Sequence, residues 1–553
     1  MTDRPTDAAP ARMTTADAAV ATLAQNGIDT LYCLPGVQND QLFDAFHTAQ
    51  DRIRPIHTRH EQGAAYMALG AAMATGKPQV YSVVPGPGFL NTTAALSTAY
   101  ACNAPVLALT GQILSASIGR GYGQLHEIPD QLAIMRQLTK FAARITGPHD
   151  AAPLVAEAFR QLRSGRPRPV ALEGAIDVWG RPGSVVLPAG PAMATPAAID
   201  GEAIAAAAKL LGAARTPLIV VGAGAQGASA EITELAEALQ APVISHRMGR
   251  GVLDSRNPLS VNLHAGHALW GAADVVLAVG TRLQAQLQGW GLDDALAIIR
   301  IDADAEELGR IAAPRIGIVA DAAPALRLLL AELPRHNTAR PSRAEELREA
   351  TARSDAELAR LEPQIGYLQA IRDVLPSDGI LVDELTQLGY VSRLTFPIHR
   401  PRGFLSPGYQ GTLGWGLATA LGAQAASPGT KVVALSGDGG FMFNVQELAT
   451  AVQFALPIVV VLVNDGAYGN VRRTQANAYG NRLFASDLRN PDFGKLVESF
   501  GAMALRATSP DELRAALARA FAAGVPTVIE VPAGPMPDPW KLLRMPRNRA
   551  RLP

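Results

Sequence analysis

Two aspartates in the last third of the chain stand where a hard cation could bind. Asp438 lies in the run Ser-Gly-Asp-Gly-Gly at 436–440, directly after the apolar stretch 432–435, and Asp465 stands just past the next apolar stretch, 458–463. Mg²⁺ takes near-octahedral oxygen ligands, usually one or two carboxylates together with phosphate oxygens. A Gly-Asp-Gly run alone predicts only a turn. Followed after 24 residues by Asn-Asp, with a helix and a strand between, it predicts a metal and diphosphate site.

A third acidic residue, Glu61, stands in the run Thr-Arg-His-Glu-Gln-Gly-Ala at 58–64. A strand is expected at 54–57, and a helix rich in small residues follows the run. An acid in the first turn of a helix has an ordinary explanation, because it complements the positive end of the helix dipole. Position alone therefore favours a structural role for Glu61.

The rest of the chain predicts the elements that must position these residues. Short apolar runs alternate with longer amphipathic stretches, a pattern typical of parallel sheets covered on both faces by helices. We therefore predict an α/β fold of three doubly wound parallel-sheet domains, at 12–180, 197–332 and 354–535, with function at the carboxyl ends of the strands. The strands that support this prediction are 80–84, 106–109, 218–221, 275–279, 432–435 and 458–463.

Two changes in composition mark the expected boundaries between domains. Residues 181–196 are rich in Pro, Gly and Ala, and residues 333–353 are charged and helix-prone. Residues 1–11 are expected to form a disordered tail. Three domains suit a length of 553 residues.

The composition favours a small-molecule enzyme of the cell interior. Lys plus Arg and Asp plus Glu both number 49, and no long basic run suggests nucleic acid or an anionic membrane surface. Cys33 and Cys102 do not make a disulfide framework, and the polar N-terminus lacks the apolar core of a signal peptide. The longest aliphatic stretch, 457–463, is far too short to span a bilayer. We expect a soluble cytoplasmic protein that binds neither nucleic acid nor membrane.

The stretch from the Gly-Asp-Gly run to Gly469 resembles the thiamine-diphosphate fingerprint of one enzyme superfamily. That superfamily contains acetohydroxyacid (acetolactate) synthase, pyruvate decarboxylase and benzaldehyde lyase. The resemblance extends over residues 14–531 or so. It implies a pyrimidine-binding domain, a central Rossmann-like domain and a diphosphate-binding domain, with thiamine diphosphate and Mg²⁺ as cofactors.

The resemblance also implies which residues hold the metal and the diphosphate. The side chains of Asp438 and Asp465 and the carbonyl of Ala467 would bind Mg²⁺. The family more often has Asn at the position of Asp465, where Asp adds negative charge beside the diphosphate, and Asn464 is the alternative ligand if the register differs by one. The other implied cofactor-binding residues are Gly437, Gly439, Gly440 and Tyr468.

At the pyrimidine end, the run Gly-Tyr-Gln-Gly-Thr-Leu-Gly-Trp-Gly at 408–416 could be a simple turn before a helix. The resemblance implies instead that the carbonyl of Gly411 accepts the 4′-amino group and that Leu413 presses the two cofactor rings into a V. It also makes Glu61 the activator, because a carboxyl bonded to N1′ favours the 4′-imino form, an internal base toward C2. In the family this Glu reaches the partner subunit's cofactor, so a homodimer is the implied minimum unit, and a tetramer is compatible with it.

Around the reactive carbon the resemblance implies Gly36, Val37 and His126. Acetohydroxyacid synthases and benzaldehyde lyase usually carry Gln at the position of His126. An imidazole there could shuttle a proton or anchor a carboxylate, and the alternative is a His that only bonds a neighbouring loop. The paired histidines of pyruvate decarboxylases are missing from this region, which weakens an aldehyde-releasing decarboxylase.

The run Gly-Ala-Gly-Ala-Gln-Gly at 222–227 follows an expected strand, but its spacing is a weak dinucleotide signal. Acetohydroxyacid synthases bind FAD in this domain. Here 262–266 only loosely resembles their flavin loop, and Arg282 fits either state, so FAD is an allowed but less favoured cofactor. His264 and His267 lack accompanying carboxylates or cysteines and are interpreted as structural.

The leading hypothesis is a thiamine-diphosphate- and Mg²⁺-dependent carboligase that acts on a 2-keto acid, similar to the catalytic subunit of acetolactate synthase. The alternatives within the class are a non-oxidative 2-keto acid decarboxylase and an aldehyde lyase. The alternative from another class is a catalytically silent, nucleotide-sensing α/β protein. The joint presence of Glu61, Asp438 and Asp465 argues against it.

Overall fold

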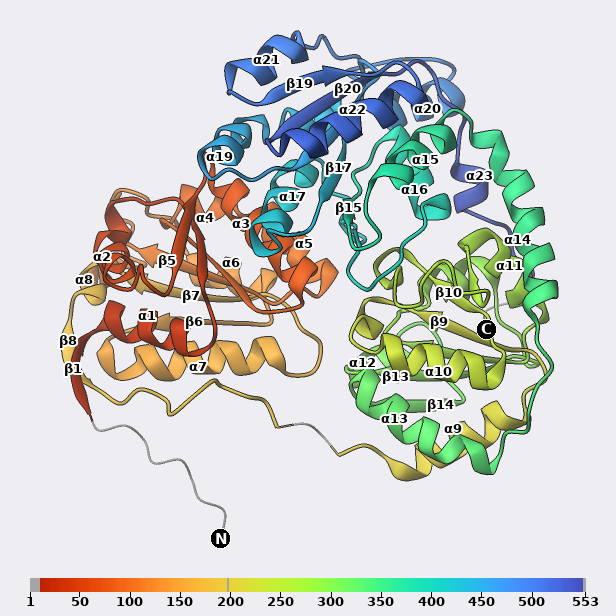
Figure 1. Cartoon of the computed structure of the whole chain (residues 1–553). Helices are drawn as coiled ribbons and strands as arrows, with labels where there is room; N and C mark the ends of the chain where they lie inside the picture. The colour runs from red at the N-terminus through yellow and green to blue at the C-terminus, as the bar shows by residue number, and fades with distance from the viewer. Residues whose placement is uncertain (1–9, 196–197, 551–553) are drawn as a thin grey trace.

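The computed structural model describes residues 10–195 and 198–550. Three six-stranded parallel sheets follow one another along the chain, each covered by helices (Figure 1). This arrangement is the one that alternating apolar and amphipathic stretches predict, and the α/β fold class is confirmed. Within the described residues, no helix combines the length and the apolar character needed to cross a membrane.

The first sheet is sandwiched between two layers of helices. Its elements are α1 (Thr15–Gln25), β2 (Thr30–Cys33), α2 (Asp40–Thr48), β3 (Arg54–His57), α3 (Glu61–Thr75), β4 (Gln79–Val83), α4 (Pro87–Asn91), α5 (Thr93–Cys102), β5 (Val106–Gln112), α6 (Gln131–Leu138), β6 (Phe141–Ile145), α7 (Pro148–Arg163), β7 (Val170–Ala175) and α8 (Ile176–Trp179). The strand order is β3-β2-β4-β5-β7-β6. Because side chains alternate along a strand, Leu31 and Cys33 pack with α1 and α7, whereas Tyr32 packs with α3 and α5.

A two-stranded antiparallel sheet joins the two ends of this domain. It pairs β1 (Ala11–Thr14) with β8 (Pro182–Val185). The expected tail at 1–11 is corrected at its end, since Ala11 begins β1, while residues 1–9 lie outside the described residues. Pro182 is tolerated in β8 because it stands at the start of an edge strand, where its missing N–H does no harm.

The second sheet has the strand order β11-β10-β9-β12-β13-β14. Its elements, followed by a helix that leads to the third sheet, are α9 (Gly201–Ala213), β9 (Pro217–Val221), α10 (Ser229–Leu239), β10 (Val243–Ser245), β11 (Ser260–Val261), α11 (Leu263–Ala272), β12 (Val275–Val279), β13 (Ala297–Asp302), α12 (Ala305–Gly309), β14 (Ile316–Val319), α13 (Ala322–Glu332) and α14 (Ala344–Leu358). The end of the chain returns to this unit, where Arg549 donates to the carbonyl of Trp270 and pairs with Asp293. Nε2 of His267 lies 2.7 Å from the carbonyl oxygen of Pro546 in the same returning segment.

The third sheet has the strand order β16-β15-β17-β18-β20-β19. Its elements are α15 (Gln364–Val374), β15 (Ile380–Val382), α16 (Gln387–Thr395), β16 (Phe404–Leu405), α17 (Trp415–Ala426), β17 (Val432–Gly437), α18 (Asp438–Phe441), α19 (Leu448–Gln453), β18 (Val459–Asn464), α20 (Gly469–Ala478), α21 (Phe493–Ser499), β19 (Met503–Arg506), α22 (Pro510–Ala523), β20 (Thr527–Pro532) and α23 (Trp540–Leu543). The helix expected between the Gly-Asp-Gly run and Asn464 is confirmed as α19, which is preceded by a 3₁₀ turn, Val445–Glu447. Because β17 and β18 are parallel neighbours, their carboxyl ends meet at one edge.

Helices α3 and α17 pack against each other and join the first and third sheets (Figure 1). A Cβ at Gly70 would lie 2.0 Å from the carbonyl oxygen of Thr419, and one at Gly422 would lie 1.9 Å from that of Met67. Only glycine allows two helix backbones to approach so closely. The first and third units therefore share one buried core, in which both helices are almost wholly enclosed.

Candidate active site

Asp438 lies at the carboxyl end of β17 as the first residue of α18, and it is buried. Its Oδ1 accepts the N–H of Gly439 at 2.9 Å, and its Oδ2 accepts the N–H of Gly466 at 2.9 Å. Nδ2 of Asn490 donates to the same Oδ2 at 2.6 Å. These donors fix the carboxylate in one orientation, toward the loop that follows β18.

Asp465 lies just past the end of β18, and its Oδ2 accepts a hydrogen bond from Nε2 of Gln387 at 3.0 Å. Burial raises the pKa of Asp465, and the negative charge of Asp438 acts in the same direction. The two carboxylates thus lie close enough to repel each other. A divalent cation bound between them would relieve this repulsion.

The neighbouring Asn464 is held in another network. Its Nδ2 donates to Oε1 of Glu530 at 2.8 Å, and its Oδ1 accepts from Nδ2 of Asn490 at 2.9 Å. Both polar atoms of the side chain are therefore in use. This favours Asp465 over Asn464 as the second metal ligand.

A cavity of about 360 Å³ opens beside Gly439 and is lined by Tyr468 and Asn490, among others. A Cβ at Gly439 would lie 2.7 Å from the ring of Tyr468, and one at Gly440 would lie 2.6 Å from the carboxyl of Glu384, so both glycines are required for close packing. Gly437 ends β17 directly before them. Ala467 sits two residues past Asp465, where its backbone is held by a bridge to Asp487.

The available donors fit a magnesium–diphosphate group. Two carboxylates, a backbone carbonyl and a cavity bordered by glycine suit a hard cation that shares its coordination shell with phosphate oxygens. Over residues 10–195 and 198–550, no cluster of three or more His, Cys, Asp and Glu side chains could hold a metal on its own. This is expected for a site that relies on backbone and phosphate oxygens.

Glu384 is a buried acid that sequence reasoning missed. Its carboxyl accepts the N–H of Gly414 at 2.5 Å and the hydroxyl of Ser436. Burial raises the pKa of Glu384 to about 7, although its hydrogen bonds oppose the shift. The carboxyl ties the start of α17 to the end of β17, the two segments that carry the expected pyrimidine and diphosphate residues. The acidic pair Asp383-Glu384, directly after the apolar run 380–382, is the signal that could have indicated it.

Gly411 and Leu413 stand on the turn before α17. Gly411 has a φ of 58°, in the left-handed region that glycine favours. Leu413 is half-buried. Oγ1 of Thr412, between them, lies 2.8 Å from Oγ1 of Thr98 on α5. The turn is therefore held against the first domain as well as by the third.

Glu61 is the first residue of α3, and Nδ1 of His60 caps this helix by accepting the N–H of Gln62. The Glu61 carboxyl is half-buried and accepts a hydrogen bond from Nδ2 of Asn91 at 3.0 Å. Within the described residues of one chain, it makes no hydrogen bond with Asp438.

The three expected substrate-pocket residues lie on two loops that meet. Nδ1 of His126 is 3.0 Å from Oε1 of Gln38, so the imidazole does bond a neighbouring loop. Val37, beside Gln38, is 50% exposed. A Cβ at Gly36 would lie 2.5 Å from Cγ1 of Val84, so packing already explains this glycine.

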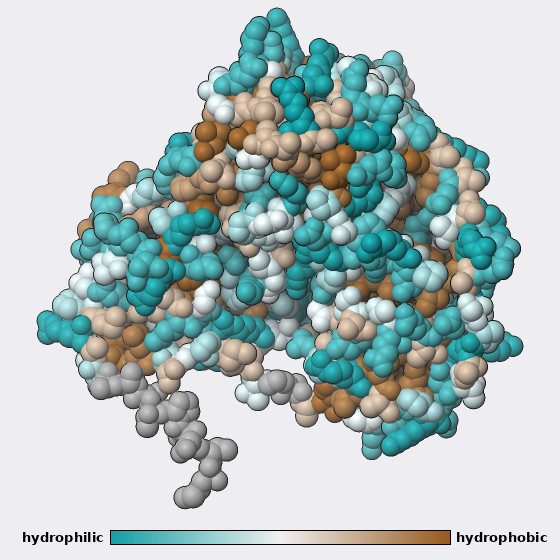
Figure 2. Space-filling view, viewed as in Figure 1, coloured by the Kyte–Doolittle hydropathy of each residue, from teal (hydrophilic) through white to brown (hydrophobic). Residues whose placement is uncertain are grey.

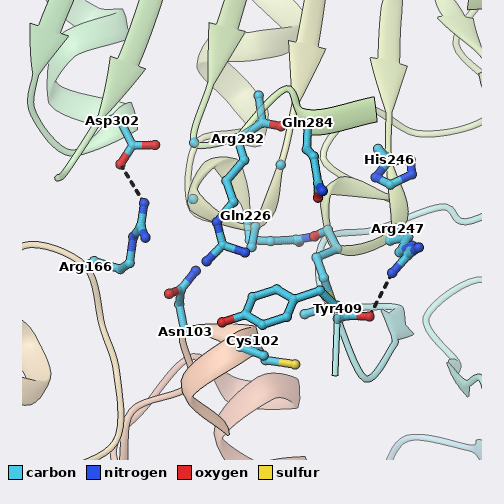
Figure 3. Close-up of a pocket in the computed structure, with 18 of the residues that line it drawn as sticks. Cys102, Asn103, Arg166, Gln226, His246, Arg247, Arg282, Gln284, Asp302 and Tyr409 are labelled. Atoms are coloured by element: carbon cyan, nitrogen blue, oxygen red, sulfur yellow. Dashed lines mark hydrogen bonds and ion pairs between the residues drawn. The ribbon is translucent and has the colours of Figure 1, made fainter. Parts of the chain in front are cut away.

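A larger cavity, of about 1070 Å³, lies between the three domains. Cys102 lines it from the first domain, His246 and Arg282 from the second, and Tyr409 from the third (Figure 3). The Arg282 guanidinium stands over the Tyr409 ring, 4.7 Å from its centroid. Burial lowers the pKa of His246 to about 3, helped by the charges of neighbouring arginines, so this imidazole is neutral.

The glycine-rich run at 222–227 lines this larger cavity, but its glycines pack against the protein itself. A Cβ at Gly222 would lie 2.3 Å from the carbonyl oxygen of Gly280, and one at Gly224 would lie 2.8 Å from the Cα of Gly280. The N–H of Gly222 donates to Val279, and that of Gly224 donates to Gly280. These two N–H groups are not free to bind a pyrophosphate, as those of a dinucleotide loop would be.

Comparisons with known proteins identify the class. Three models of the thiamine pyrophosphate enzyme family match in order: the N-terminal TPP binding domain at 13–134, the central domain at 204–329 and the C-terminal TPP binding domain at 386–531. The chain belongs to the thiamine pyrophosphate enzyme family, thiamine pyrophosphate being thiamine diphosphate. The resemblance found in the sequence is confirmed.

Relatives of known name narrow the class to carboligases and lyases. The chain is 34% identical to a probable 2-ketoarginine decarboxylase of Pseudomonas aeruginosa, over 94% of each chain. It is 32% identical to the acetolactate synthase large subunit of Parasynechococcus marenigrum, over 95% of this chain and 88% of that protein. It is also 32% identical to a probable acetolactate synthase large subunit of Methanocaldococcus jannaschii, over 94% of this chain and 92% of that protein. The chain is therefore an enzyme of the thiamine-diphosphate-dependent class.

Proposed function

We propose that the protein uses thiamine diphosphate and Mg²⁺ to break and form a carbon–carbon bond next to the carbonyl of a 2-keto acid. One observation carries the proposal. Asp438 and Asp465 converge at the carboxyl ends of two neighbouring strands, beside a cavity bordered by Gly439, in a chain of the thiamine pyrophosphate enzyme family. This donor set argues against the alternative of a catalytically silent sensor protein.

In this proposal the chain's own residues divide the work. Asp438, Asp465 and the carbonyl of Ala467 would bind Mg²⁺ and, through it, the diphosphate. The carbonyl of Gly411 and the side chain of Leu413 would position the pyrimidine, and the carboxyl of Glu61 would share a proton with N1′. Bound there, thiamine diphosphate would supply an electron sink next to the substrate carbonyl.

The proposed active unit is at least a homodimer, with a tetramer also compatible. Its support is that large apolar side chains remain exposed near the site: Phe443, just after α18, is 48% exposed, Leu125 is 66% exposed and Phe484 is 83% exposed. Figure 2 shows apolar patches over the part of the C-terminal domain that carries α19 and on the upper edge of the N-terminal domain. A partner chain covering them would also enclose the half-buried Glu61.

We further propose that the protein is cytoplasmic and needs no FAD. Free, buried Cys33 and Cys102 suit a reducing compartment. The paired N–H groups of Gly222 and Gly224 argue against a flavin pyrophosphate on this loop. If the absorption spectrum of the purified protein showed one bound flavin per chain, the proposal that no FAD is needed would be wrong.

We retain 12–180, 197–332 and 354–535 as proposed domain boundaries. Each range encloses one of the three six-stranded sheets. Limited proteolysis should cut first within 186–196, past β8, and within 333–343, ahead of α14. Early cuts inside a sheet would contradict these boundaries.

Carboligation is the first candidate for the overall reaction, since acetolactate synthases recur among the relatives. Release of an aldehyde is the second candidate. It is favoured by the 34% identical relative named a probable 2-ketoarginine decarboxylase and by a titratable imidazole at His126. In either case a 2-keto acid loses its carboxyl group, and the candidates differ in whether the shortened carbonyl product leaves or is joined to a second carbonyl compound.

A substrate panel tests the proposal. Pyruvate, benzoylformate and 2-ketoarginine would each be supplied with thiamine diphosphate and Mg²⁺, with and without an acceptor aldehyde, and carbon dioxide, aldehyde and ligated product would be measured. We expect one 2-keto acid to be consumed only when both cofactors are present. Consumption of none, by a protein that is folded and loaded with cofactor, would contradict the proposed reaction.

His126→Gln is the variant that separates the two candidate reactions. If the imidazole protonates or anchors a substrate group, the variant should show a different pH–rate profile from the wild type. The ratio of aldehyde to ligated product should change more than the affinity for cofactor. An unchanged ratio and an unchanged profile would leave His126 with only its structural bond to Gln38.

A further inference from the structure

A second buried acid, Glu447, crosses from the third domain to the turn that carries Glu61. It lies in the 3₁₀ turn Val445–Glu447 that follows α18, and its side chain is fully buried. Its Oε2 accepts the hydroxyl of Thr450 at 2.6 Å. Both carboxylate oxygens of Glu447 also face the first domain.

There the carboxylate accepts two backbone N–H groups, from the two residues directly before Glu61. The N–H of Arg59 lies 3.2 Å from Oε1 and 3.1 Å from Oε2, and the N–H of His60 lies 3.0 Å from Oε1. Hydrogen bonds to an ionised carboxylate are shorter and stronger than neutral ones. A single side chain therefore holds both peptide groups that precede the first turn of α3.

The turn is also built to receive this carboxylate. Gly63 faces it, and a Cβ there would lie 2.5 Å from Oε1 of Glu447. Oγ1 of Thr58 donates to the carbonyl of His60 at 2.8 Å, which closes the turn from the other side. A helix begins at Glu61, so any shift of Arg59 and His60 moves the backbone from which the Glu61 side chain leaves.

We propose that Glu447 is the positioning residue for Glu61: its carboxylate clamps the two peptide groups before Glu61 and so sets where the activating carboxyl stands. This inference rests on the proposed function, in which Glu61 shares a proton with N1′. If Glu61 serves the partner's cofactor, the clamp links the metal-binding segment of one site to the activator of the other. If Glu447 only held the two domains together, its substitution would lower the stability of the fold and leave activation of the cofactor by Glu61 unchanged.

The test measures activation of the cofactor directly, without substrate. Full-length protein loaded with thiamine diphosphate and Mg²⁺ is placed in deuterated buffer, quenched in acid, and the exchange of the C2 proton is followed by proton NMR. Cofactor retention and thermal unfolding are measured on the same samples. The variants are Glu447→Gln, Gly63→Ala and Glu61→Gln.

Glu447→Gln should slow C2 exchange about tenfold, which corresponds to one charge-assisted hydrogen bond, because the amide turns an N–H toward a backbone N–H. Cofactor retention should change by less than about threefold, since neither the metal ligands nor the glycines of that site are touched. Gly63→Ala should slow exchange as well, because its methyl group displaces the Glu447 carboxylate even though Ala favours the helix. If Glu447→Gln does not fold, the exchange rate of Gly63→Ala tests the positioning role of Glu447.

Gln453→Ala is the matched control. Gln453 crosses the same interface, where its Oε1 accepts from Nη2 of Arg59 at 2.9 Å, but its side-chain hydrogen bonds there are with side chains and not with the backbone. Exchange should stay within about twofold of wild type, because an exposed side-chain hydrogen bond contributes little.

Two outcomes would overturn the inference, and they can be told apart. Slow exchange in Glu61→Gln with wild-type exchange in folded Glu447→Gln and Gly63→Ala would remove the positioning role and leave the proposed function intact. Wild-type exchange in Glu61→Gln would instead remove the role of Glu61 itself, and the inference with it.

Discussion

Two glycine-rich runs follow parallel strands in this molecule, and they do different things. The run at 222–227 follows β9, and the run at 437–440 begins at the last residue of β17. In the first, the glycines make room for the backbone of Gly280, and the N–H groups of Gly222 and Gly224 are already paired. In the second, the glycines flank Asp438, which faces the end of the neighbouring strand.

The difference shows that a glycine pattern predicts that another group lies close to the backbone, but it does not predict which group that is. In the central domain the approaching group is the protein's own backbone. In the third domain the glycines surround a buried carboxylate beside a cavity, and a second carboxylate, Asp465, lies at the next strand end. The residue between the glycines, Ala223 in one run and Asp438 in the other, carries the chemical information.

The largest effect is expected from removing that residue. Asp438→Ala should lower Mg²⁺-dependent affinity for thiamine diphosphate by about 100-fold or more, because the diphosphate charge loses a carboxylate-bound cation. Gel-filtered wild-type protein should carry the cofactor, and the variant should not. Ala223→Ser, at the matching place in the central run, is the control and should retain it. Stoichiometric cofactor in Asp438→Ala would show that the metal site lies elsewhere.

Substituting the glycines should separate stability from cofactor binding. Gly222→Ala should lower the free energy of unfolding by about 1–3 kcal/mol, because its methyl group meets the fixed backbone of Gly280. Gly439→Ala meets the movable ring of Tyr468 and should lower cofactor affinity about tenfold with a smaller loss of stability. Gly227→Ala, with open space around its Cβ, is the control. If Gly222→Ala lowered the affinity for cofactor and left the free energy of unfolding unchanged, the two glycine runs would not differ in the way described.

A smaller effect concerns the pH dependence of stability. Burial raises the pKa of Glu384 from 4.5 to about 7, so the folded protein holds this proton more tightly than the unfolded chain does. The stabilisation is complete below pH 4.5 and is lost as the pH rises to about 7. Relative to Glu384→Gln, the wild type should therefore lose about 3 kcal/mol over this window.

Thermal unfolding of the cofactor-free proteins, measured at about pH 5 and about pH 8, checks this prediction. The gap between Glu384→Gln and wild type should widen at the higher pH. Glu498→Gln, at an exposed acid of the same domain, should show the same gap at both values. A gap for Glu384→Gln that does not change with pH would contradict the assigned shift.

Local pattern was enough to predict the sheets and the strand ends that carry chemistry. The strand Val275–Val279 has the predicted bounds, because a compact apolar run flanked by turn residues defines a buried strand. The strand Arg54–His57 also has the predicted bounds, although only Ile56 in it is buried. β8 was missed because Pro182 and Gly183 argue against a strand unless a partner such as β1 is known.

The side chains that support the site could not be predicted in the same way. Asn490 reaches Asp438 from 52 residues away, and Gln387 reaches Asp465 from 78 residues away. Glu447 meets its two N–H donors across more than 380 residues. Such contacts depend on how the domains pack, and no local pattern encodes them. The roles of Glu61, His126 and the metal ligands remain predictions that the experiments above test.

The most direct measurement compares wild type and Glu61→Gln in one titration of thiamine diphosphate with Mg²⁺, recording thermal unfolding and consumption of the 2-keto acid together. Both proteins should be stabilised, by about 2.7 kcal/mol at 100 times the dissociation constant. Only the wild type should consume substrate at full rate, with the variant slower by about 100-fold or more, because the proton at N1′ is no longer shared. No stabilisation of either protein, or turnover of Glu61→Gln within a few-fold of wild type, would contradict a thiamine-diphosphate enzyme activated by Glu61.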